Sequence, residues 1–118
     1  MTTPSPATGL LPGTLDVLIL KALSMGAEHG YGVLLRIQSL SNDVLAIEQG
    51  ALYPALFRLE RQGLVEAEWG QSDNNRRAKF YSLTTAGRKR LAADVVSWRR
   101  LVEAMDRVLD ARTLEPAR

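Results

Sequence analysis

Apolar positions recur at helical spacing soon after the chain begins. Residues 1–13 hold three prolines and two glycines, and we expect them to form a flexible tail. From Leu15 to Ser24 the apolar residues recur at intervals of three and four, which predicts a helix capped by Thr14. This stretch is apolar on most sides, so it needs cover from more than one surface. We expect a partner subunit to provide part of that cover.

A break, a second helix and a turn follow. Residues 26–32 (GAEHGYG) contain three glycines and separate the first helix from a second one, predicted from Tyr31 to Leu40. Residues 41–43 (SND) are typical of a turn. The single histidine of the chain, His29, lies in the break and is expected to support the turn there.

The third predicted helix carries its leucines on one side. Leu52, Leu56 and Leu59 are spaced at i, i+4 and i+7, so they are expected to face the core. Pro54 is tolerated if the helix begins near residue 50 or 51, because N–H groups in a first turn have no helical partners. Gly63 fits a C-terminal stop.

The pattern then changes from helical spacing to alternation. Val65, Ala67 and Trp69 alternate with two glutamates, which predicts a strand. After the polar, turn-rich residues 70–75, a second strand is predicted from Lys79 to Leu83. Two strands around one turn make a β-hairpin.

The last predicted helix carries a heptad seam. Either Thr84 or Thr85 can cap this helix, which is expected to end near Ala111. Its apolar residues are separated by 4, 3, 4, 3 and 4 positions, a coiled-coil spacing. They are Leu91, Val95, Trp98, Val102, Met105 and Leu109. The seam packs either on a second copy or back on its own domain. We favour a homodimer whose interface also includes Leu15 and Leu18.

Composition narrows the class of protein. The chain has 118 residues, of which 46% are hydrophobic and 24% charged, as expected for one globular domain. It has no cysteine and one histidine, so we expect no disulfide, no metal site and no cofactor. No apolar run reaches the ~18–20 residues of a membrane span. The N-terminus carries no secretory signal, so the expectation is a cytoplasmic protein with no membrane partner.

The distribution of charge is more informative than its total. A net charge of +2 identifies no partner. Residues 74–90, however, contain six basic residues and no acidic one. The six are Arg76, Arg77, Lys79, Arg88, Lys89 and Arg90. Such a block is either a solvated basic face or a surface that binds a polyanion. A solvated face should interleave acidic residues, and Asp73 is the only one nearby.

Three helices, a β-hairpin and a long helix make a winged helix-turn-helix, mainly α with a small β-hairpin. The expected units are a DNA-binding domain at 14–83, a C-terminal dimerisation helix at 84–112 and a flexible tail at 113–118. In this arrangement the third helix enters the major groove of double-stranded DNA. The basic hairpin beside it reaches phosphates or the adjacent minor groove.

Candidate DNA-binding residues lie where this geometry needs them. If the three leucines face inward, the outer side of the third helix carries Ala51, Pro54, Arg58 and Arg61, with Tyr53 and Gln62 at its borders. Gln49 precedes the helix, where backbone N–H groups can also meet a phosphate. The DNA-binding candidates among these are Gln49, Ala51, Tyr53, Pro54 and Arg58. The hairpin adds Asn75, Arg76, Arg77 and Lys79. Arg58 can bind either a guanine edge or a phosphate. No nucleophile or acid–base pair converges anywhere, so an enzyme is not expected.

Four segments resemble the PadR-like family of transcriptional regulators. They are LPGTLDVLILKAL (11–23), HGYGVLLRI (29–37), IEQGALYPALFRLERQGLVEAEW (47–69) and RRAKFYSLTTAGRKRL (76–91). LYPALFRLE and the aromatic-Ser-Leu-Thr-x-x-Gly step occur in the expected order, and the resemblance covers about residues 10–110. The single C-terminal helix resembles the short members of the family.

The resemblance implies a homodimeric repressor. A dimer of two DNA-binding units is expected to address a near-palindromic operator. The resemblance also implies DNA contact by Tyr31, which is otherwise a half-buried packing residue. The chain departs from the family at Ala51, where many relatives have Ser or Thr, so a hydrogen bond available to them is absent.

The middle of the seam offers a candidate effector site. Some relatives bind flat aromatic compounds between tryptophans at the dimer interface. Trp98, with Val95 and Val102 beside it, is therefore either a packed interface residue or part of a site for a small aromatic effector. The competing function for the whole chain is a winged-helix adaptor that binds proteins and not DNA. The basic block favours DNA, because an adaptor does not require it.

Overall fold

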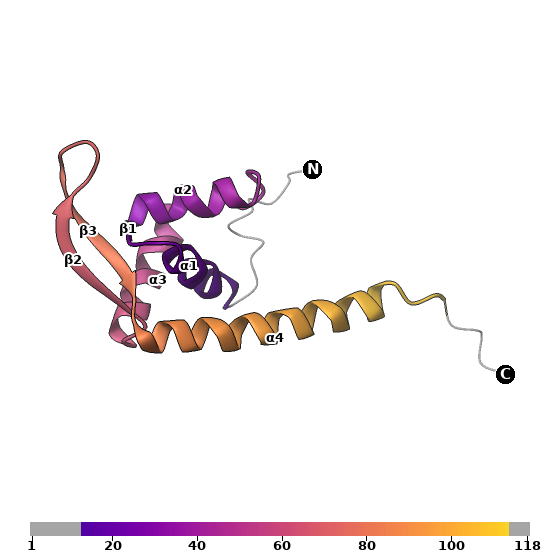
Figure 1. The fold of residues 1–118 in the computed structure, drawn as a ribbon. Helices are drawn as coiled ribbons and strands as arrows, with labels where there is room; N and C mark the ends of the chain where they lie inside the picture. The colour runs from indigo at the N-terminus through magenta and orange to yellow at the C-terminus, as the bar shows by residue number, and fades with distance from the viewer. Residues whose placement is uncertain (1–12, 114–118) are drawn as a thin grey trace.

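The computed structural model describes residues 13–113. Along the chain lie α1 (Thr14–Ser24), β1 (Glu28–His29), α2 (Gly30–Leu40), α3 (Gln49–Arg61), β2 (Val65–Gln71), β3 (Arg77–Leu83) and α4 (Thr85–Leu109). Figure 1 shows α1, α2 and α3 gathered beside a small sheet, with α4 running past them and projecting well beyond. The predicted winged-helix fold with a long C-terminal helix is confirmed. The predicted tails lie outside the described residues, apart from Gly13 and Thr113.

The sheet has three antiparallel strands in the order β1-β3-β2. The predicted hairpin is β2 and β3, paired from Val65 opposite Leu83 to Gln71 opposite Arg77. The third strand, β1, pairs Glu28 with Tyr81 and adds to the other edge of β3. Local pattern does not predict β1, because two residues are too few to show alternation and their partner strand is about fifty positions away.

One core joins the three short helices to the sheet. The buried side chains come from all of them, and the largest fully buried ones are Ile19, Leu20, Leu23, Val33, Leu52, Leu56, Leu59 and Val65. Burying each such side chain stabilises the fold by about 1.5–3 kcal/mol. Leu52, Leu56 and Leu59 face the core as predicted. The opposite side of α3 is therefore exposed.

Two details of the helix starts differ from the predictions. The N-cap of α1 is Gly13, whose φ of 87° is favourable for glycine, and Thr14 is already helical. The prediction that Thr14 is the cap is therefore wrong. In α3 the helix begins at Gln49, so Pro54 is its sixth residue and lies past the first turn. The proline removes one interior hydrogen bond, a loss that the buried residues on both sides of it offset.

The C-terminal end of α3 closes as predicted. Gly63 has a φ of 75°, and its N–H donates to the carbonyl of Glu60 while that of Leu64 donates to the carbonyl of Leu59, 3.0 Å each. These paired bonds are the Schellman motif, which needs a left-handed residue at the glycine position. The turn directs the chain from the end of α3 straight into β2.

The start of α4 is anchored to that same turn. The Thr84 hydroxyl accepts a hydrogen bond from the Gly87 N–H at 3.0 Å and donates one to the carbonyl of Gly63 at 2.7 Å. Thr84 is therefore the cap, one of the two candidates predicted. A Cβ on Gly87 would lie 2.0 Å from the carbonyl oxygen of Leu64, so only glycine allows this close approach. The C-terminal end of α3 and the beginning of α4 are thus firmly connected.

Beyond its first turns α4 leaves the core. Leu91 still packs on the core, whereas every residue from Val96 to Leu109 is exposed. Across residues 13–113, no helix is both long enough and apolar enough to cross a membrane.

Candidate nucleic-acid interface

The exposed side of α3 forms the centre of the candidate site. Leu52, Ala55, Leu56 and Leu59 are buried, and the helix turns all five of its predicted DNA-binding residues to solvent. These are Gln49, Ala51, Tyr53, Pro54 and Arg58. The helical periodicity predicted this side correctly, because the leucine stripe defines its opposite.

Phe57 also lies on this side, although it was not among the predicted DNA-binding residues. Its side chain is 59% exposed, and the guanidinium of Arg61 lies over the ring, 5.7 Å from the ring centroid. An aromatic residue beside the core leucines is easily taken for another core residue. The usable signal was its angular position, because a residue one step after Leu56 and five steps after Leu52 points away from the leucine stripe.

Arg58 leans toward α1 rather than straight outward. Its guanidinium contacts the carboxylate of Asp16 at 2.5 Å. Asp16 lies in the first turn of α1, and its side chain is 14% exposed against 51% for Arg58. The ion pair holds the arginine at the edge of the exposed face, where half of its side chain remains accessible.

The hairpin presents its basic residues around a tight turn. The N–H of Ser72 donates to the carbonyl of Arg76 at 2.8 Å, and that of Asn75 donates to the carbonyl of Ser72 at 2.8 Å. Asn75 adopts a φ of 58°, a conformation that asparagine tolerates better than most residues. Asn75, Arg76 and Arg77 are all exposed.

Two contacts hold the basic chains that lie along the hairpin. The guanidinium of Arg77 lies 4.5 Å from the ring centroid of Trp69. Lys79 reaches across to α3, where its Nζ is 3.3 Å from Oε1 of Glu60. Trp69 itself is 58% exposed, although it lies on the same side of β2 as the buried Val65. Its cross-strand partner Lys79 lines the groove rather than the core, so this end of the sheet faces open space.

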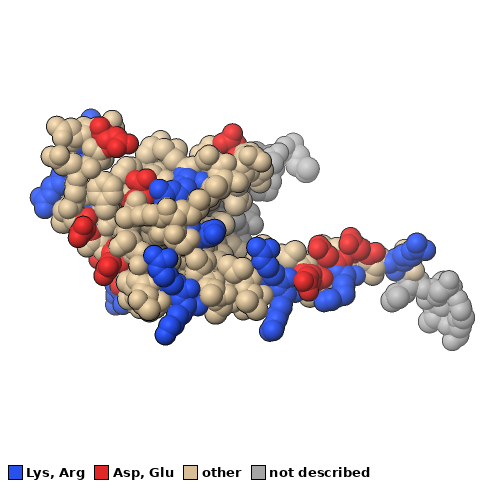
Figure 2. Space-filling view, in the orientation of Figure 1, with Lys and Arg blue, Asp and Glu red and all other residues tan. Residues whose placement is uncertain are grey.

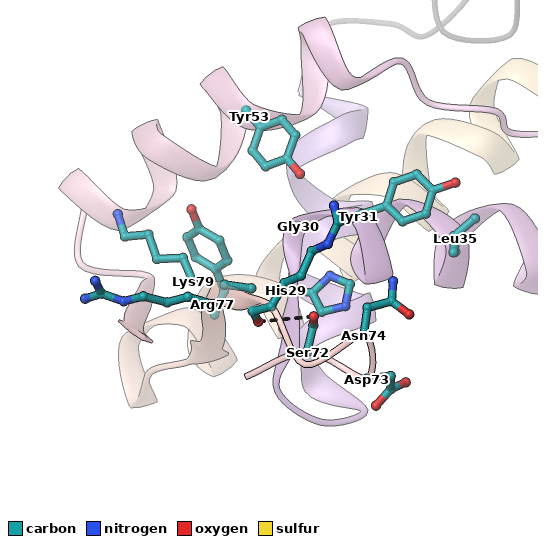
Figure 3. Close-up of a pocket in the computed structure, with 13 residues that line it drawn as sticks. His29, Gly30, Tyr31, Leu35, Tyr53, Ser72, Asp73, Asn74, Arg77 and Lys79 are labelled. Carbon is teal, nitrogen blue, oxygen red and sulfur yellow. Dashed lines mark hydrogen bonds between the residues drawn. The ribbon is translucent and has the colours of Figure 1, made fainter. Parts of the chain in front are cut away.

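A groove of about 560 Å³ separates the hairpin from α2 and α3. Figure 3 shows Tyr53 on α3, Tyr31 on α2 and the hairpin side chains around this one space. Arg76, Arg77 and Lys79 line its hairpin side. The hairpin wall also includes Asp73, so it carries three cations and one carboxylate. A groove with a net positive wall on one side and phenols on the other suits a sugar–phosphate backbone, which accepts hydrogen bonds from both.

His29 and Tyr31 have different roles at this groove. The Nδ1 atom of His29 accepts a hydrogen bond from the N–H of Gly32 at 3.0 Å, which caps α2 and confirms the predicted structural role in the turn. Its ring meets Phe80 edge-on, with centroids 5.5 Å apart. Tyr31 is exposed beside it, which leaves its hydroxyl accessible to a ligand in the groove.

Below the groove lies Tyr81, the one tyrosine in the core. Burial raises the pKa of its phenol above the ordinary 10.0, while the ammonium of Lys79 lowers it and the carboxylate of Glu60 raises it further. Residues 13–113 contain no cluster of histidine and carboxylate side chains that could hold a metal ion.

The predicted dimer residues divide into two sets. Leu15, Leu18 and Leu91 pack partly against the core of their own chain. The others lie farther along α4, and four of them are exposed: Trp98, Val102, Met105 and Leu109. Figure 2 shows acidic and basic side chains mixed along this projecting half of α4. A shallow cavity of about 300 Å³ adjoins Trp98 and includes Val17 of α1, but Val95 and Val102 do not line it.

Comparison with known proteins identifies relatives over most of the chain. The model of the transcriptional regulator PadR-like family matches residues 19–93. A PadR family regulator from Eggerthella lenta is 31% identical, covers 85% of each chain and has a TM-score of 0.70. One from Clostridium difficile is 28% identical and covers 82% of this chain and 99% of its own, with a TM-score of 0.71. A transcriptional regulator from Clostridium thermocellum is 25% identical, covers 80% and 89%, and has a TM-score of 0.73.

Proposed function

Because this chain belongs to the PadR-like family of transcriptional regulators, we propose that it is a homodimeric repressor of a near-palindromic operator. Family membership makes it a DNA-binding regulator and not an enzyme. The proposal adds the oligomeric state, the sign of regulation and the residues that bind DNA. It divides the chain into a DNA-binding unit at 14–83 and a dimerisation helix at 84–112.

One observation carries the DNA-binding assignment: Tyr53 from the exposed side of α3 and the basic residues of the hairpin line the same groove. In a winged helix-turn-helix the third helix lies in the major groove and the hairpin contacts the backbone. The proposed contacts from the helical side are Tyr31, Gln49, Ala51, Tyr53, Pro54 and Arg58. Those from the hairpin are Asn75, Arg76, Arg77 and Lys79.

The exposed seam of α4 supports the dimer. An apolar stripe on a helix that projects beyond its own core marks a protein–protein interface. Val102, Met105 and Leu109 lie on that stripe and are accessible. A second copy of the same helix would cover them, and Leu15, Leu18, Leu91, Val95 and Trp98 would adjoin the interface. A dimer also presents two α3 helices to the two halves of a palindrome.

A small aromatic effector at Trp98 is the proposed means of control. The cavity beside Trp98 is lined by both α1 and α4, so a ligand there would contact the DNA-binding unit and the dimerisation helix together. Val95 and Val102 would complete the site from the partner's side of the seam. The simpler alternative is a packed interface tryptophan, which would bind no ligand.

Fluorescence anisotropy tests the DNA assignment. Purified protein is titrated against DNA from upstream of its own gene and against a random duplex, each at two salt concentrations. Strong preference for the upstream DNA, with affinity that falls steeply as salt rises, supports a sequence-specific regulator. Absence of binding to both duplexes at low salt overturns the proposal and favours the protein-binding adaptor.

The effector assignment needs its own measurement. Flat aromatic compounds are titrated against a Trp69→Phe variant, in which Trp98 is the remaining tryptophan and reports binding by its fluorescence. A compound that binds tightly should change the affinity for DNA, because coupling between two sites is reciprocal. Tight binding at Trp98 with unchanged DNA affinity would show that the site does not control the regulator.

A further inference from the structure

One stripe of α3 points directly away from the core. Gly50, Pro54, Phe57 and Arg61 follow one another at intervals of four, three and four positions, on the side opposite Leu52 and its neighbours. All four are exposed. From the first to the last the stripe is about 16 Å long. That length spans about five base pairs of a duplex, at about 3.4 Å for each.

The chemistry of this stripe is unusual for a helix that reads DNA. Gly50 has no side chain, and a Cβ built on it would meet nothing within 4 Å. Pro54 carries no polar group. Arg61 is therefore the one hydrogen-bonding side chain of the stripe, and Phe57 is its largest apolar one. Base recognition along this stripe therefore depends on the ring of Phe57 and the guanidinium of Arg61.

Other charges near the stripe already have partners in the structure. Arg58 is paired with Asp16, and Lys79 is paired with Glu60. Arg61 instead lies over the ring of Phe57, an arrangement in which a guanidinium and an aromatic face attract each other. Phe57, Arg58, Arg61 and Gln62 line a hollow of about 300 Å³ on this face.

We infer that Phe57 reads the methyl group of a thymine in the operator, next to a guanine bound by Arg61. Thymine is the one base that presents a methyl group in the major groove, and an apolar side chain such as phenylalanine is its fitting partner. A guanidinium binds O6 and N7 of guanine through two hydrogen bonds. The cation–π contact with Phe57 orients Arg61 before DNA arrives. The inference rests on the proposed function, because it requires α3 in the major groove.

The test removes the methyl group and the ring separately. The tightest duplex is first selected from a random pool by the wild-type protein, and each thymine in it is then replaced by deoxyuridine, which lacks only that methyl. We expect one thymine in each half-site to respond. Its replacement by deoxyuridine should lower the affinity of the wild-type protein about three- to fivefold, which is the effect of one buried methyl group. Phe57→Ala should lower the affinity for the unmodified duplex about tenfold and be insensitive to deoxyuridine at that position.

Two further variants control for general effects. Phe57→Leu retains an apolar contact and should keep part of the sensitivity to deoxyuridine. Val44→Ala shortens another exposed apolar side chain, in the loop after α2, and should leave affinity and sensitivity unchanged. If the wild type selects a specific duplex but no thymine responds to deoxyuridine, or if Phe57→Ala keeps the full response, the inference is wrong and the proposed function stands. If no specific duplex is selected, both are wrong.

Discussion

The backbone of Gly30 lies directly beneath the ring of Tyr53. A Cβ on Gly30 would be 2.5 Å from Cε1 of that ring and 2.9 Å from Cζ, far closer than atoms pack in proteins. Gly30 is the first residue of α2, and Tyr53 projects from α3. The missing side chain therefore allows the two helices to approach and sets the orientation of Tyr53 at the groove.

Gly30→Ala should lower DNA affinity more than it lowers stability. The added methyl forces the ring of Tyr53 away, and the ring can move because it is partly exposed. We expect the free energy of unfolding to fall by about 1 kcal/mol and the affinity for operator DNA to fall severalfold. Denaturant unfolding and anisotropy measure the two effects. In a Tyr53→Ala background Gly30→Ala should change neither, and equal losses in both backgrounds would contradict the argument.

Asp16→Asn should strengthen binding to DNA of any sequence. The change removes the carboxylate that holds Arg58 and a negative charge beside the proposed contact surface. The salt dependence should steepen by about one phosphate contact. Stability should fall by less than about 1 kcal/mol, because half of the Arg58 side chain is exposed to solvent. Asp94→Asn is the matched control, since it breaks the Arg90 pair on α4. An equal gain in DNA affinity in both variants would show that the change in net charge alone causes the effect.

Loss of both hairpin arginines should weaken binding without changing sequence preference. Arg76→Ala combined with Arg77→Ala removes two exposed cations from the wall of the groove. Affinity for operator and random DNA should fall by similar factors, and the slope of log affinity against log salt should decrease by about two. Arg99→Ala with Arg100→Ala removes the same charge from exposed positions of α4 and should have a smaller effect. A hairpin variant that binds as tightly as the parent at physiological salt would refute the assignment.

The sequence predicted the elements whose pattern is local. The leucines of α3 and the seam of α4 repeat within their own helices, so periodicity located both faces. The Gly63 stop depends on neighbouring residues and was also predictable, and the sequence narrowed the cap of α4 to Thr84 or Thr85.

Features that depend on distant contacts could not be predicted in this way. Asp16 and Arg58 are 42 positions apart, and β1 exists only because β3 pairs with it. Trp69 lies on the same side of β2 as the buried Val65, yet at its cross-strand partner Lys79 that side faces the groove rather than the core. Local pattern gives the side on which a residue lies, whereas burial depends on whether another element reaches that side.

Val102→Glu should break the proposed dimer. The residue lies on the seam, where a second copy would bury the introduced charge without a partner, a change that costs several kcal/mol. Sedimentation should show monomers, and the affinity for a palindromic operator should fall toward that for a single half-site. Val96→Glu adds the same charge at an exposed position on the other side of α4 and should leave the dimer intact. If both variants remain dimeric, the seam is not the interface.

Alkaline pH should destabilise the fold through Tyr81. Burial raises the pKa of its phenol in the folded state above the unfolded value of 10.0, so the folded state holds the proton to higher pH. The stability from the buried neutral phenol is complete below about pH 10 and is lost as the pH rises through the folded pKa, since the unfolded chain then binds fewer protons. Denaturant unfolding at a series of pH values measures this decline. The loss of stability at alkaline pH should be smaller in Tyr81→Phe. It should be unchanged in Tyr31→Phe, because Tyr31 is exposed. An unchanged decline in Tyr81→Phe would show that another group is responsible.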